Sequence, residues 1–299
     1  MTKSQAWLKA LRLRTLPLSL SGIILGSAIA YKNGFWDTTI FVLAMITTVL
    51  FQIVSNLAND LGDSQKGADN AERIGPVRAV QSGIISISEM KKAVILTSFL
   101  SFCSAAPLIY LGTKNMPTSI LTVYVGLAIL CVLAAITYTV GKKAYGYSGF
   151  GDVFVFIFFG LVSLLGVYTL FAKSIDYLNI LPAMSIGFLS TAVLNLNNMR
   201  DEYNDKKVGK NTFVAKMGGL KAKYYHSILI MGGIISLMSF LKIQDSPFGA
   251  IGIVPALVLI IHLKKVQKTT NPVDYDPELK KVALTTFAMS VLTSILMNI

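Results

Sequence analysis

The sequence predicts an all-α integral membrane protein with nine transmembrane helices. Hydrophobic residues make up 54% of the 299-residue chain and charged residues only 14%, whereas soluble domains carry about 25% charged residues. The apolar residues come in long blocks without strand or amphipathic-helix periodicity, and about 20 such residues suffice to cross the hydrocarbon core of a bilayer. The loops between the blocks alternate between basic and non-basic, as the loops of a multi-pass protein do.

Nine apolar blocks are the candidate spans. In chain order they cover residues 16–32, 38–58, 92–112, 118–138, 150–172, 177–198, 223–242, 247–263 and 281–298. The opening segment is basic and amphipathic, and no small-residue cleavage site follows the first block, so we expect no signal peptide. The eighth block is short and contains Pro255, which makes it the weakest candidate.

The basic residues predict the orientation of the chain. Nine spans place successive loops on alternate sides, and 23 of the 27 Lys and Arg residues then share the side of the N-terminus. Because Lys and Arg concentrate in cytoplasmic loops, we expect a cell-membrane protein with a cytoplasmic N-terminus and an external C-terminus. The net charge of +12 is therefore a signal of membrane topology, and we expect no nucleic-acid partner.

Acidic residues gather in two clusters, at the ends of the second and sixth spans. The clusters cover residues 56–69 and 197–212. If both spans continue as helices, each cluster places one asparagine and two aspartates on one helical face. These residues are Asn56, Asp60 and Asp63 in the first cluster and Asn197, Asp201 and Asp205 in the second. Carboxylates on one face repel each other, more strongly where the effective dielectric constant is low, so both clusters indicate a bound cation.

The expected cation is a hard one. Its candidate ligands are all oxygen donors, without a nearby His or Cys, which suits Mg²⁺ or Ca²⁺ and argues against zinc or copper. Basic residues lie between the acids, and Mg²⁺ often joins carboxylates to substrate phosphates. These basic residues are Lys66, Arg73, Arg78, Lys142, Lys206, Lys207 and Lys210. The pattern therefore favours a site that binds a phosphorylated substrate through a metal.

The repetition of the acidic cluster carries this interpretation. Solvation of a helix end would explain one such cluster, and membrane topology alone would explain the basic residues. Both clusters, however, follow a span and begin a long polar loop, four spans apart. We therefore predict a single domain, residues 1–299, of two four-helix halves and a ninth helix, with the site between the halves.

Several motifs resemble the UbiA superfamily of intramembrane prenyltransferases, in particular the branch that prenylates 1,4-dihydroxy-2-naphthoate in menaquinone synthesis. The motifs are R-L-R-T-L-P at 12–17, N-D-L-G-D-S-Q-K-G-A-D at 59–69, R-I-G-P-V-R-A-V-Q-S-G at 73–83, Y-G-Y-S-G-F-G-D-V-F-V-F-I-F-F-G at 145–160 and N-N-M-R-D-E-Y-N-D-K-K-V-G-K-N-T at 197–212. They extend from the N-terminus to about residue 218. The resemblance implies nine transmembrane helices around a central cavity, Mg²⁺ dependence and a cytoplasmic cap.

The resemblance also implies roles for individual residues. The family's first motif matches Asn59, Asp60, Asp63 and Asp69, and its second matches Asp201 and Asp205. Five residues separate Asp63 from Asp69 where the commonest pattern has three, as in the naphthoate branch. The aspartates would hold two Mg²⁺ ions on the diphosphate of a polyprenyl donor, and Asn59 would assist. The substrate-binding candidates are Arg14, Asn56, Arg78, Lys142, Asn197 and Lys210.

The implied reaction joins the polyprenyl group to the naphthoate ring, with loss of diphosphate and CO₂, and gives a demethylmenaquinone. Other acceptors within the superfamily are 4-hydroxybenzoate, homogentisate, haem and chlorophyllide. The G-P-V-R-A-V-Q stretch and the Lys-Gly insertion favour the naphthoate. Membrane lipid is the other expected partner, and the sequence leaves the oligomeric state and the prenyl chain length open.

Two interpretations from other classes are weaker. A secondary transporter usually binds its substrate near the bilayer midplane, with charged residues or broken helices there. The spans of this chain are nearly free of charge, and its acids cluster at one membrane face. A phosphatidyltransferase that uses a CDP-alcohol would carry a D-G-x-x-A-R type motif, which the sequence lacks.

A few features of the spans complete the predictions. The phenylalanines at 154, 156, 158 and 159 either line the cavity, where their ring faces would stabilise a cation, or make the packing and lipid contacts more usual for this residue. We expect His226 and His262 to lie at the membrane interface. Ser86 and Glu89 predict a capping box before the third span.

Overall fold

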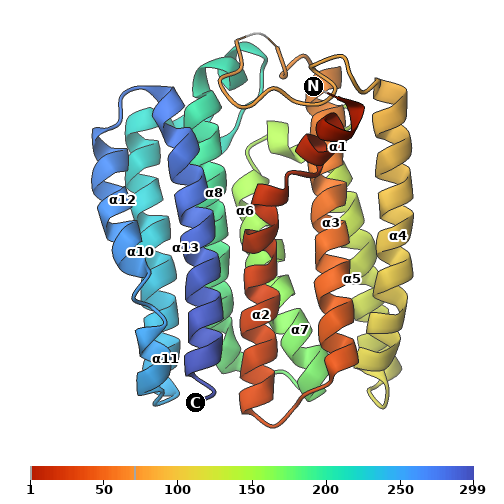
Figure 1. The fold of residues 1–299 in the computed structure, drawn as a ribbon, viewed down its shortest axis with the longest axis vertical. Helices are drawn as coiled ribbons and strands as arrows, with labels where there is room; N and C mark the ends of the chain where they lie inside the picture. Colours follow the sequence, from red (N-terminus) through yellow and green to blue (C-terminus); the bar gives the residue numbers. More distant parts are fainter. Residues whose placement is uncertain (1, 71) are drawn as a thin grey trace.

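The structure, a computed structural model, describes residues 2–70 and 72–299. It is an all-helical bundle whose N- and C-termini lie at opposite ends (Figure 1). Nine helical stretches within the described residues are long and apolar enough to cross a membrane, as the sequence predicts. They cover Lys3–Lys32, Thr38–Gln65, Ile87–Thr113, Thr118–Thr137, Gly151–Ala172, Tyr177–Lys207, Gly219–Ile243, Pro247–Lys268 and Pro272–Leu296.

Thirteen α-helices build these stretches and the surface segments between them. In the described chain they are α1 (Lys3–Leu11), α2 (Leu16–Lys32), α3 (Thr38–Gln65), α4 (Ile87–Thr113), α5 (Thr118–Thr137), α6 (Gly151–Val155), α7 (Ser163–Ala172), α8 (Ile180–Lys207), α9 (Phe213–Met217), α10 (Gly219–Ile243), α11 (Pro247–Ile251), α12 (Ala256–Lys268) and α13 (Tyr275–Leu296). A π-helical segment, Phe156–Val162, joins α6 to α7. Short 3₁₀ turns precede α2, α6, α8 and α13.

Several spans extend further than their apolar blocks. Helices α3 and α8 continue for seven and nine residues beyond the predicted ends, to Gln65 and Lys207, so both acidic clusters begin on helices as expected. Hydrophobicity does not mark these ends, because the last turns of each helix are polar. Helix α4 starts early, at the predicted capping box of Ser86 and Glu89.

The eighth span is interrupted, as its proline suggests. Helix α11 ends at Ile251, and α12 begins at Ala256 directly after Pro255. Proline cannot donate the backbone hydrogen bond that a continuous helix requires, but it fits the start of one. The span is therefore two helices joined by a tight turn.

The ninth helix closes the bundle. Helix α13 packs against α2, from the first half of the chain, and against α8, from the second (Figure 1). Helices α3, α4 and α5 pack on one another, and α8 packs against α10 and the π-helical segment. This arrangement leaves a cavity between the two halves.

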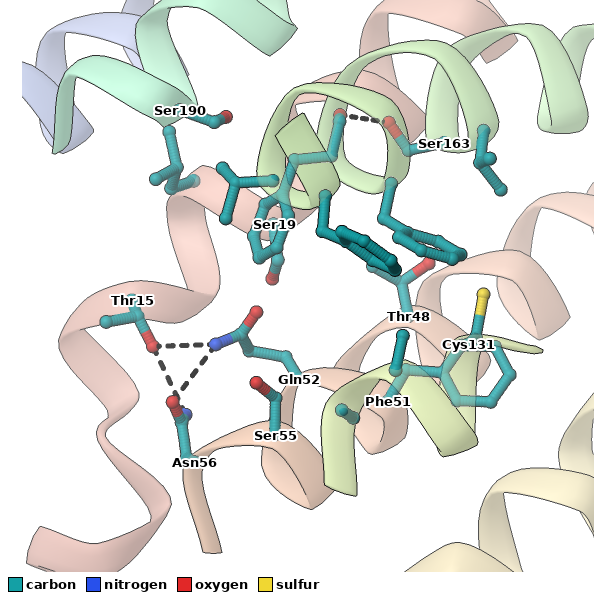
Figure 2. Close-up of a pocket in the computed structure, with 18 of the residues that line it drawn as sticks. Thr15, Ser19, Thr48, Phe51, Gln52, Ser55, Asn56, Cys131, Ser163 and Ser190 are labelled. Atoms are coloured by element: carbon teal, nitrogen blue, oxygen red, sulfur yellow. Dashed lines mark hydrogen bonds between the residues drawn. The ribbon is translucent and has the colours of Figure 1, made fainter. Parts of the chain in front are cut away.

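The cavity has a volume of about 390 Å³ and is lined by α2 to α8 and by α13. Its wall is apolar along the bundle, where it includes Ile23, Leu108, Leu127 and Leu170. Polar side chains from α2, α3 and α8 line another part, and Figure 2 shows Thr15, Gln52 and Asn56 grouped there. The cavity thus combines a polar region with a long apolar one.

His226 and His262, which we expect at the membrane interface, do not lie on the surface of the protein. Both side chains are fully buried between α10, α12 and α13. Their Nε2 atoms lie 2.8 Å apart, and His262 Nδ1 lies 2.5 Å from Glu278 Oε2. The physical reason is that Glu278, on α13, supplies the polar partner that a buried imidazole needs.

Close packing between the π-helical segment and α8 yields a prediction. A Cβ atom added at Gly160 would lie 2.5 Å from the carbonyl oxygen of Ala183 and 2.6 Å from the Cα of Gly187. Since both are backbone atoms, Gly160→Ala should force the helices apart and lower the free energy of unfolding by about 1–3 kcal/mol. Gly126→Ala, where a Cβ would meet nothing within 4 Å, is the control. Equal thermal unfolding temperatures of the two variants in detergent would contradict this close packing.

Candidate active site

Asp63 is the first-motif carboxylate that faces the cavity. It lies in the last turn of α3, is 2% exposed and lines the cavity wall. Its Oδ2 accepts a hydrogen bond from Arg78 Nη1 at 2.7 Å, and its Oδ1 accepts one from the Tyr147 hydroxyl at 2.8 Å. Lys210 Nζ lies 3.6 Å from the same Oδ1. Three elements distant in sequence therefore converge on one carboxylate.

Asp60 has a different environment. Its carboxylate accepts the backbone N–H groups of Ala79 and Val80, at 3.1 and 3.4 Å, and it does not line the cavity. These bonds attach the loop after the first motif to α3. Spacing along the helix brings Asp60 near Asp63, but the loop occupies its oxygen atoms.

Asn56 holds the N-terminal segment against α3. Its Nδ2 donates to the carbonyl of Leu11 at 2.9 Å and to Thr15 Oγ1 at 3.2 Å, while its Oδ1 accepts from Gln52 at 3.1 Å (Figure 2). The side chain lines the cavity with its hydrogen-bonding groups already engaged. Asn59, one turn further along, also lines the cavity and lies 3.4 Å from the Thr139 hydroxyl.

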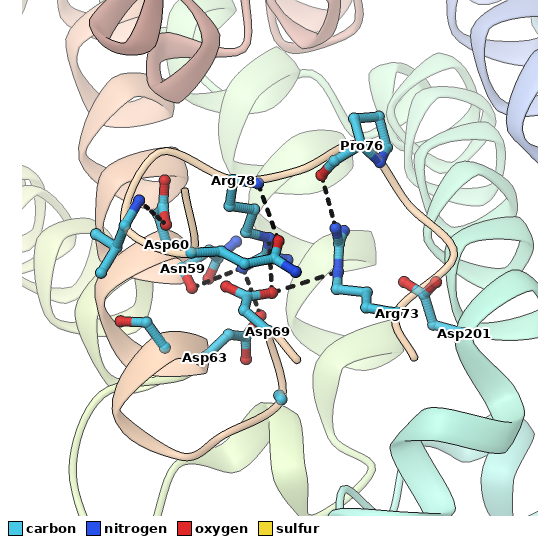
Figure 3. Close-up of polar contacts among 12 residues, drawn as sticks. Asn59, Asp60, Asp63, Asp69, Arg73, Pro76, Arg78 and Asp201 are labelled. Atoms are coloured by element: carbon cyan, nitrogen blue, oxygen red, sulfur yellow. Dashed lines mark hydrogen bonds and ion pairs between the residues drawn. The ribbon is translucent and has the colours of Figure 1, made fainter. Parts of the chain in front are cut away.

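Asp69 lies in the loop between α3 and α4, with its side chain 1% exposed between two arginines (Figure 3). Its Oδ1 is 3.1 Å from Arg78 Nε and 3.3 Å from Arg73 Nε, yet neither of its oxygen atoms accepts a well-oriented hydrogen bond from the described residues. Burial raises the pKa of Asp69 to about 6, although both arginines act to lower it. Such a carboxylate is poorly compensated by the protein alone.

Arg78 connects the first motif. Its Nη1 donates to the carbonyl of Asn59 at 2.8 Å as well as to Asp63, and its Nε faces Asp69 (Figure 3). Burial alone would lower its pKa, but the neighbouring carboxylates, led by Asp63, raise it above the ordinary value. The guanidinium therefore stays charged and neutralises both Asp63 and Asp69.

In the second motif, Asp201 is held by its neighbour in the sequence. Arg200 Nε donates to Asp201 Oδ1 at 2.9 Å and Arg200 Nη2 to Oδ2 at 2.8 Å. The same Nη2 donates to Asn197 Oδ1 at 2.8 Å. Asn197 lines the cavity, whereas Asp201 lies behind it.

Lys210 lies between the two motifs. Its Nζ is 3.6 Å from Asp63 Oδ1 and 3.9 Å from Asp205 Oδ1, and it lines the cavity while only 7% exposed. Asp205 Oδ2 is buried without a hydrogen-bond partner among the described residues. Lys210 thus neutralises one acid from each half of the chain.

The donor chemistry fits a hard cation. The acids that converge here offer only carboxylate oxygens, and those of Asp69 and Asp205 keep free lone pairs. Within the described ranges, no three His, Cys, Asp or Glu side chains meet closely enough to hold a metal ion unaided. Mg²⁺ commonly takes one or two carboxylates and completes its shell with water and substrate phosphates, and the residues present fit that mode.

Two further predicted substrate-binding residues lie at the margin of this site. Arg14 lines the cavity but its side chain is 49% exposed, and its Nη1 lies 3.6 Å from Asp276 Oδ2. Lys142 is exposed in the loop after α5 and does not line the cavity. The structure therefore does not bring Lys142 to the other candidates, because the chain after α5 turns it outward.

Three other residues of the site have no role in the sequence-based predictions. The hydroxyl of Tyr147 binds Asp63, and only its place in the Y-G-Y-S-G motif marks it in the sequence. Arg12 lines the cavity, and its buried Nη2 has no hydrogen-bond partner in the described chain. Arg200 counts in the sequence only as a topology signal, although an arginine beside an acid at the end of an apolar span suggests an internal pair.

The phenylalanine-rich π-helical region borders the apolar part of the cavity. Phe154, Phe158 and Phe159 line the wall, as one of the two predicted alternatives requires. Phe156 instead packs against Phe188 of α8, with ring centroids 4.9 Å apart. The region thus serves both packing and the cavity surface.

Comparisons with known proteins agree on one family. The sequence pattern of the UbiA prenyltransferase family matches residues 19–277. A 1,4-dihydroxy-2-naphthoate octaprenyltransferase of Escherichia coli is 42% identical over 94% of this chain and 91% of its own length. The enzyme of the same name from Haemophilus influenzae is 41% identical over 98% of this chain and 96% of its own.

Solved structures share the fold. A UbiA homolog from Aeropyrum pernix superposes with a TM-score of 0.69 at 16% identity, over 95% of this chain and 97% of that one. A UbiA homolog from Archaeoglobus fulgidus bound to GPP and Mg²⁺ gives a TM-score of 0.60 at 15% identity, over 96% and 99% of the two chains. At these identities the likeness concerns the fold alone.

The position of Arg78 between two buried acids predicts a large effect on stability. Arg78→Ala would remove the cation that Asp63 and Asp69 share, so the free energy of unfolding in detergent with EDTA should fall by about 3 kcal/mol. The control is Lys206→Ala, which removes an ion pair between Glu202 and a lysine side chain that is 50% exposed. It should lower the free energy of unfolding by less than about 1 kcal/mol. Similar losses in the two variants would show that Arg78 does not neutralise the buried acids.

Proposed function

Because this chain belongs to the UbiA prenyltransferase family, we propose that it transfers a polyprenyl group from a polyprenyl diphosphate to 1,4-dihydroxy-2-naphthoate. Diphosphate and CO₂ leave, and the product is the hydroquinone form of a demethylmenaquinone. The observation that carries the proposal is the cavity, in which Asp63 and Lys210 adjoin a long apolar wall. Identity above 40% to two enzymes named for this acceptor supports the choice of the naphthoate.

The polar end of the cavity suits the diphosphate of the donor. Arg78 and Lys210 line it and carry positive charge close to both motifs. Arg14, at the more exposed margin, supplies a further cation. Cations fixed in a water-poor site stabilise the charge that develops on a departing diphosphate. Asn59 and Asn197 offer carboxamide groups on the same wall.

Asp63 and Asp69 from the first motif, and Asp201 and Asp205 from the second, would hold two Mg²⁺ ions together with the diphosphate. Bound Mg²⁺ would supply positive charge to the leaving group. The Archaeoglobus fulgidus homolog of the same fold was solved with GPP and Mg²⁺ bound, which supports a divalent metal here. Asp60, whose carboxylate binds the loop, would support the site from behind.

The apolar part of the cavity would hold the prenyl chain and the reacting carbon. Each buried CH₂ contributes about 0.8 kcal/mol. Cleavage of the C1–O bond leaves an allylic cation, which the ring faces of Phe154, Phe158 and Phe159 can stabilise. The walls also keep water from the cation.

The acceptor ring then attacks through the carbon that carries its carboxylate. A carbon–carbon bond forms, the bond to the carboxylate breaks, and its electron pair restores the aromatic ring as CO₂ departs. This step neither takes up nor releases a proton, so it needs no general base.

We propose that the site opens at the cytoplasmic face. The acids of both motifs lie on the same side as 23 of the 27 basic residues, and such residues favour the cytoplasm. The donor would then place its diphosphate at the cytoplasmic surface and its tail in the bilayer. The C-terminus would lie outside.

The proposal predicts a metal-dependent activity with a defined acceptor. Full-length protein in liposomes, given radiolabelled polyprenyl diphosphate and Mg²⁺, should prenylate 1,4-dihydroxy-2-naphthoate, and EDTA should abolish the product. Asp63→Asn and Asp205→Asn should each lower kcat/KM at least about 100-fold, because each removes charge that holds the metal–diphosphate complex. Asp274→Asn, an exposed acid outside the site, should retain activity.

The outcomes distinguish the alternatives. Product from 4-hydroxybenzoate in place of the naphthoate would keep the chemistry and change the acceptor. Activity that persists in EDTA, or in both aspartate variants, would refute the metal-assisted mechanism. Folding of each variant is checked by its thermal unfolding curve in detergent.

A further inference from the structure

We propose that Asp276, at the start of the last helix, is a positioning residue that acts on the second motif through Arg200. In the sequence Asp276 is an ordinary cytoplasmic loop acid, and it lies outside both motifs and outside the cavity wall. Its Oδ1 nevertheless lies 2.5 Å from Arg200 Nη1. The inference rests on the proposed function, because it concerns how Asp201 is presented to a metal–diphosphate complex.

Arg200 is the largest of the fully buried side chains in the described chain, at 1% exposure. Its guanidinium donates to three side chains: to both oxygens of Asp201, to the carboxamide oxygen of Asn197 and to Asp276 Oδ1. A guanidinium group is planar and rigid, so the hydrogen-bond partners of Arg200 fix its orientation. The orientation of Arg200 in turn fixes the plane of the Asp201 carboxylate.

Electrostatics give Asp276 a second effect. A guanidinium paired with Asp201 alone would cancel the charge of that carboxylate and weaken its attraction for a cation. Because Asp276 is also paired with Arg200, the three side chains together carry one net negative charge. Arg14 lies further from Asp276, at 3.6 Å and half exposed, and screens this charge less. Asp201 can therefore hold Arg200 and still favour a metal ion.

The loop after the first motif fixes the other side of the guanidinium. A Cβ atom added at Gly75 would lie 2.7 Å from Arg200 Nη2 and 2.6 Å from Arg73 Nη2. The backbone of this loop thus lies directly over the guanidinium of Arg200. Arg73, from the same loop, is close enough to Asp201 to act on it electrostatically. Figure 3 shows Asp201 at the edge of the first-motif cluster, beside Arg73. Arg200 is confined between α8, α13 and this loop.

The ninth helix consequently has a role in the site. Helix α13 packs against α8, and the packing sets Asp276 opposite Arg200. Neither repeated half of the chain contains Asp276. The second motif, as the structure arranges it, is completed by a carboxylate from outside the repeat.

The test compares Asp276→Asn with Asp274→Asn in the full-length protein. Asp274 lies two residues earlier, is exposed and forms no ion pair among the described residues, so both changes remove the same charge from the same turn. Prenyl transfer is measured for kcat, for KM of the donor and for the Mg²⁺ concentration at half-maximal rate. The second readout is the increase in Tm that Mg²⁺ with inorganic pyrophosphate produces, which requires no acceptor.

We expect Asp276→Asn to raise the half-maximal Mg²⁺ concentration and to lower kcat/KM by about 10–100-fold, the range for partners of metal ligands. Its Tm without ligand should match that of Asp274→Asn, and the increase with Mg²⁺ and pyrophosphate should shrink. Asp276→Glu should recover most of the activity. Adding Asp276→Asn to Arg200→Lys should lower activity little further, because both act on one network.

Two results would overturn the proposal. One is an Asp276→Asn protein with the same Mg²⁺ requirement and pyrophosphate response as Asp274→Asn. The other is a lowered Tm with unchanged KM and Mg²⁺ requirement in the protein that remains folded, which would make Asp276 a structural contact only. If the wild-type protein does not prenylate the naphthoate, the proposed acceptor is wrong. The increase in Tm with Mg²⁺ and pyrophosphate still tests the role of Asp276.

Discussion

The structure depends on the neutralisation of buried carboxylates at one end of the bundle. Asp63, Asp69, Asp201 and Asp205 are nearly inaccessible to water, and an uncompensated charge in such a place costs several kcal/mol. Each is therefore placed beside a cation from the surrounding protein. These cations come from α8, from the loop after α3 and from the segment after α8.

Among the acids of the two motifs, the compensation by described residues is incomplete at Asp69 and Asp205. Asp60 is satisfied by backbone N–H groups and Asp201 by a guanidinium, so both are held in place by the protein. Asp69 and Asp205 keep oxygen atoms without partners among the described residues. Buried polar atoms of this kind are the ones that a water, an ion or a substrate commonly satisfies. Asp60 thus supports the site from behind, whereas Asp69 and Asp205 keep oxygen atoms that a ligand can satisfy.

The rest of the bundle separates this polar end from a hydrocarbon-like interior. Close contacts at Gly160 and Gly187 let the π-helical segment lie against α8, and its phenylalanines then border the cavity. A prenyl diphosphate has the same two-part character, with a charged head and an apolar tail. Chemistry at the junction is shielded from water by the same walls that hold the tail.

The sequence by itself determined the nine spans, their all-helical class and the two acidic motifs, because long apolar blocks and repeated spacings are local properties of a chain. It also indicated the family, through motifs that extend over most of its length. Only the tertiary structure decided that Asp60 binds a loop while Asp63 faces the cavity, that His226 and His262 are buried, and that Asp276 reaches Arg200. These facts depend on which helices become neighbours, and a carboxylate's role depends on the charges that the fold brings beside it.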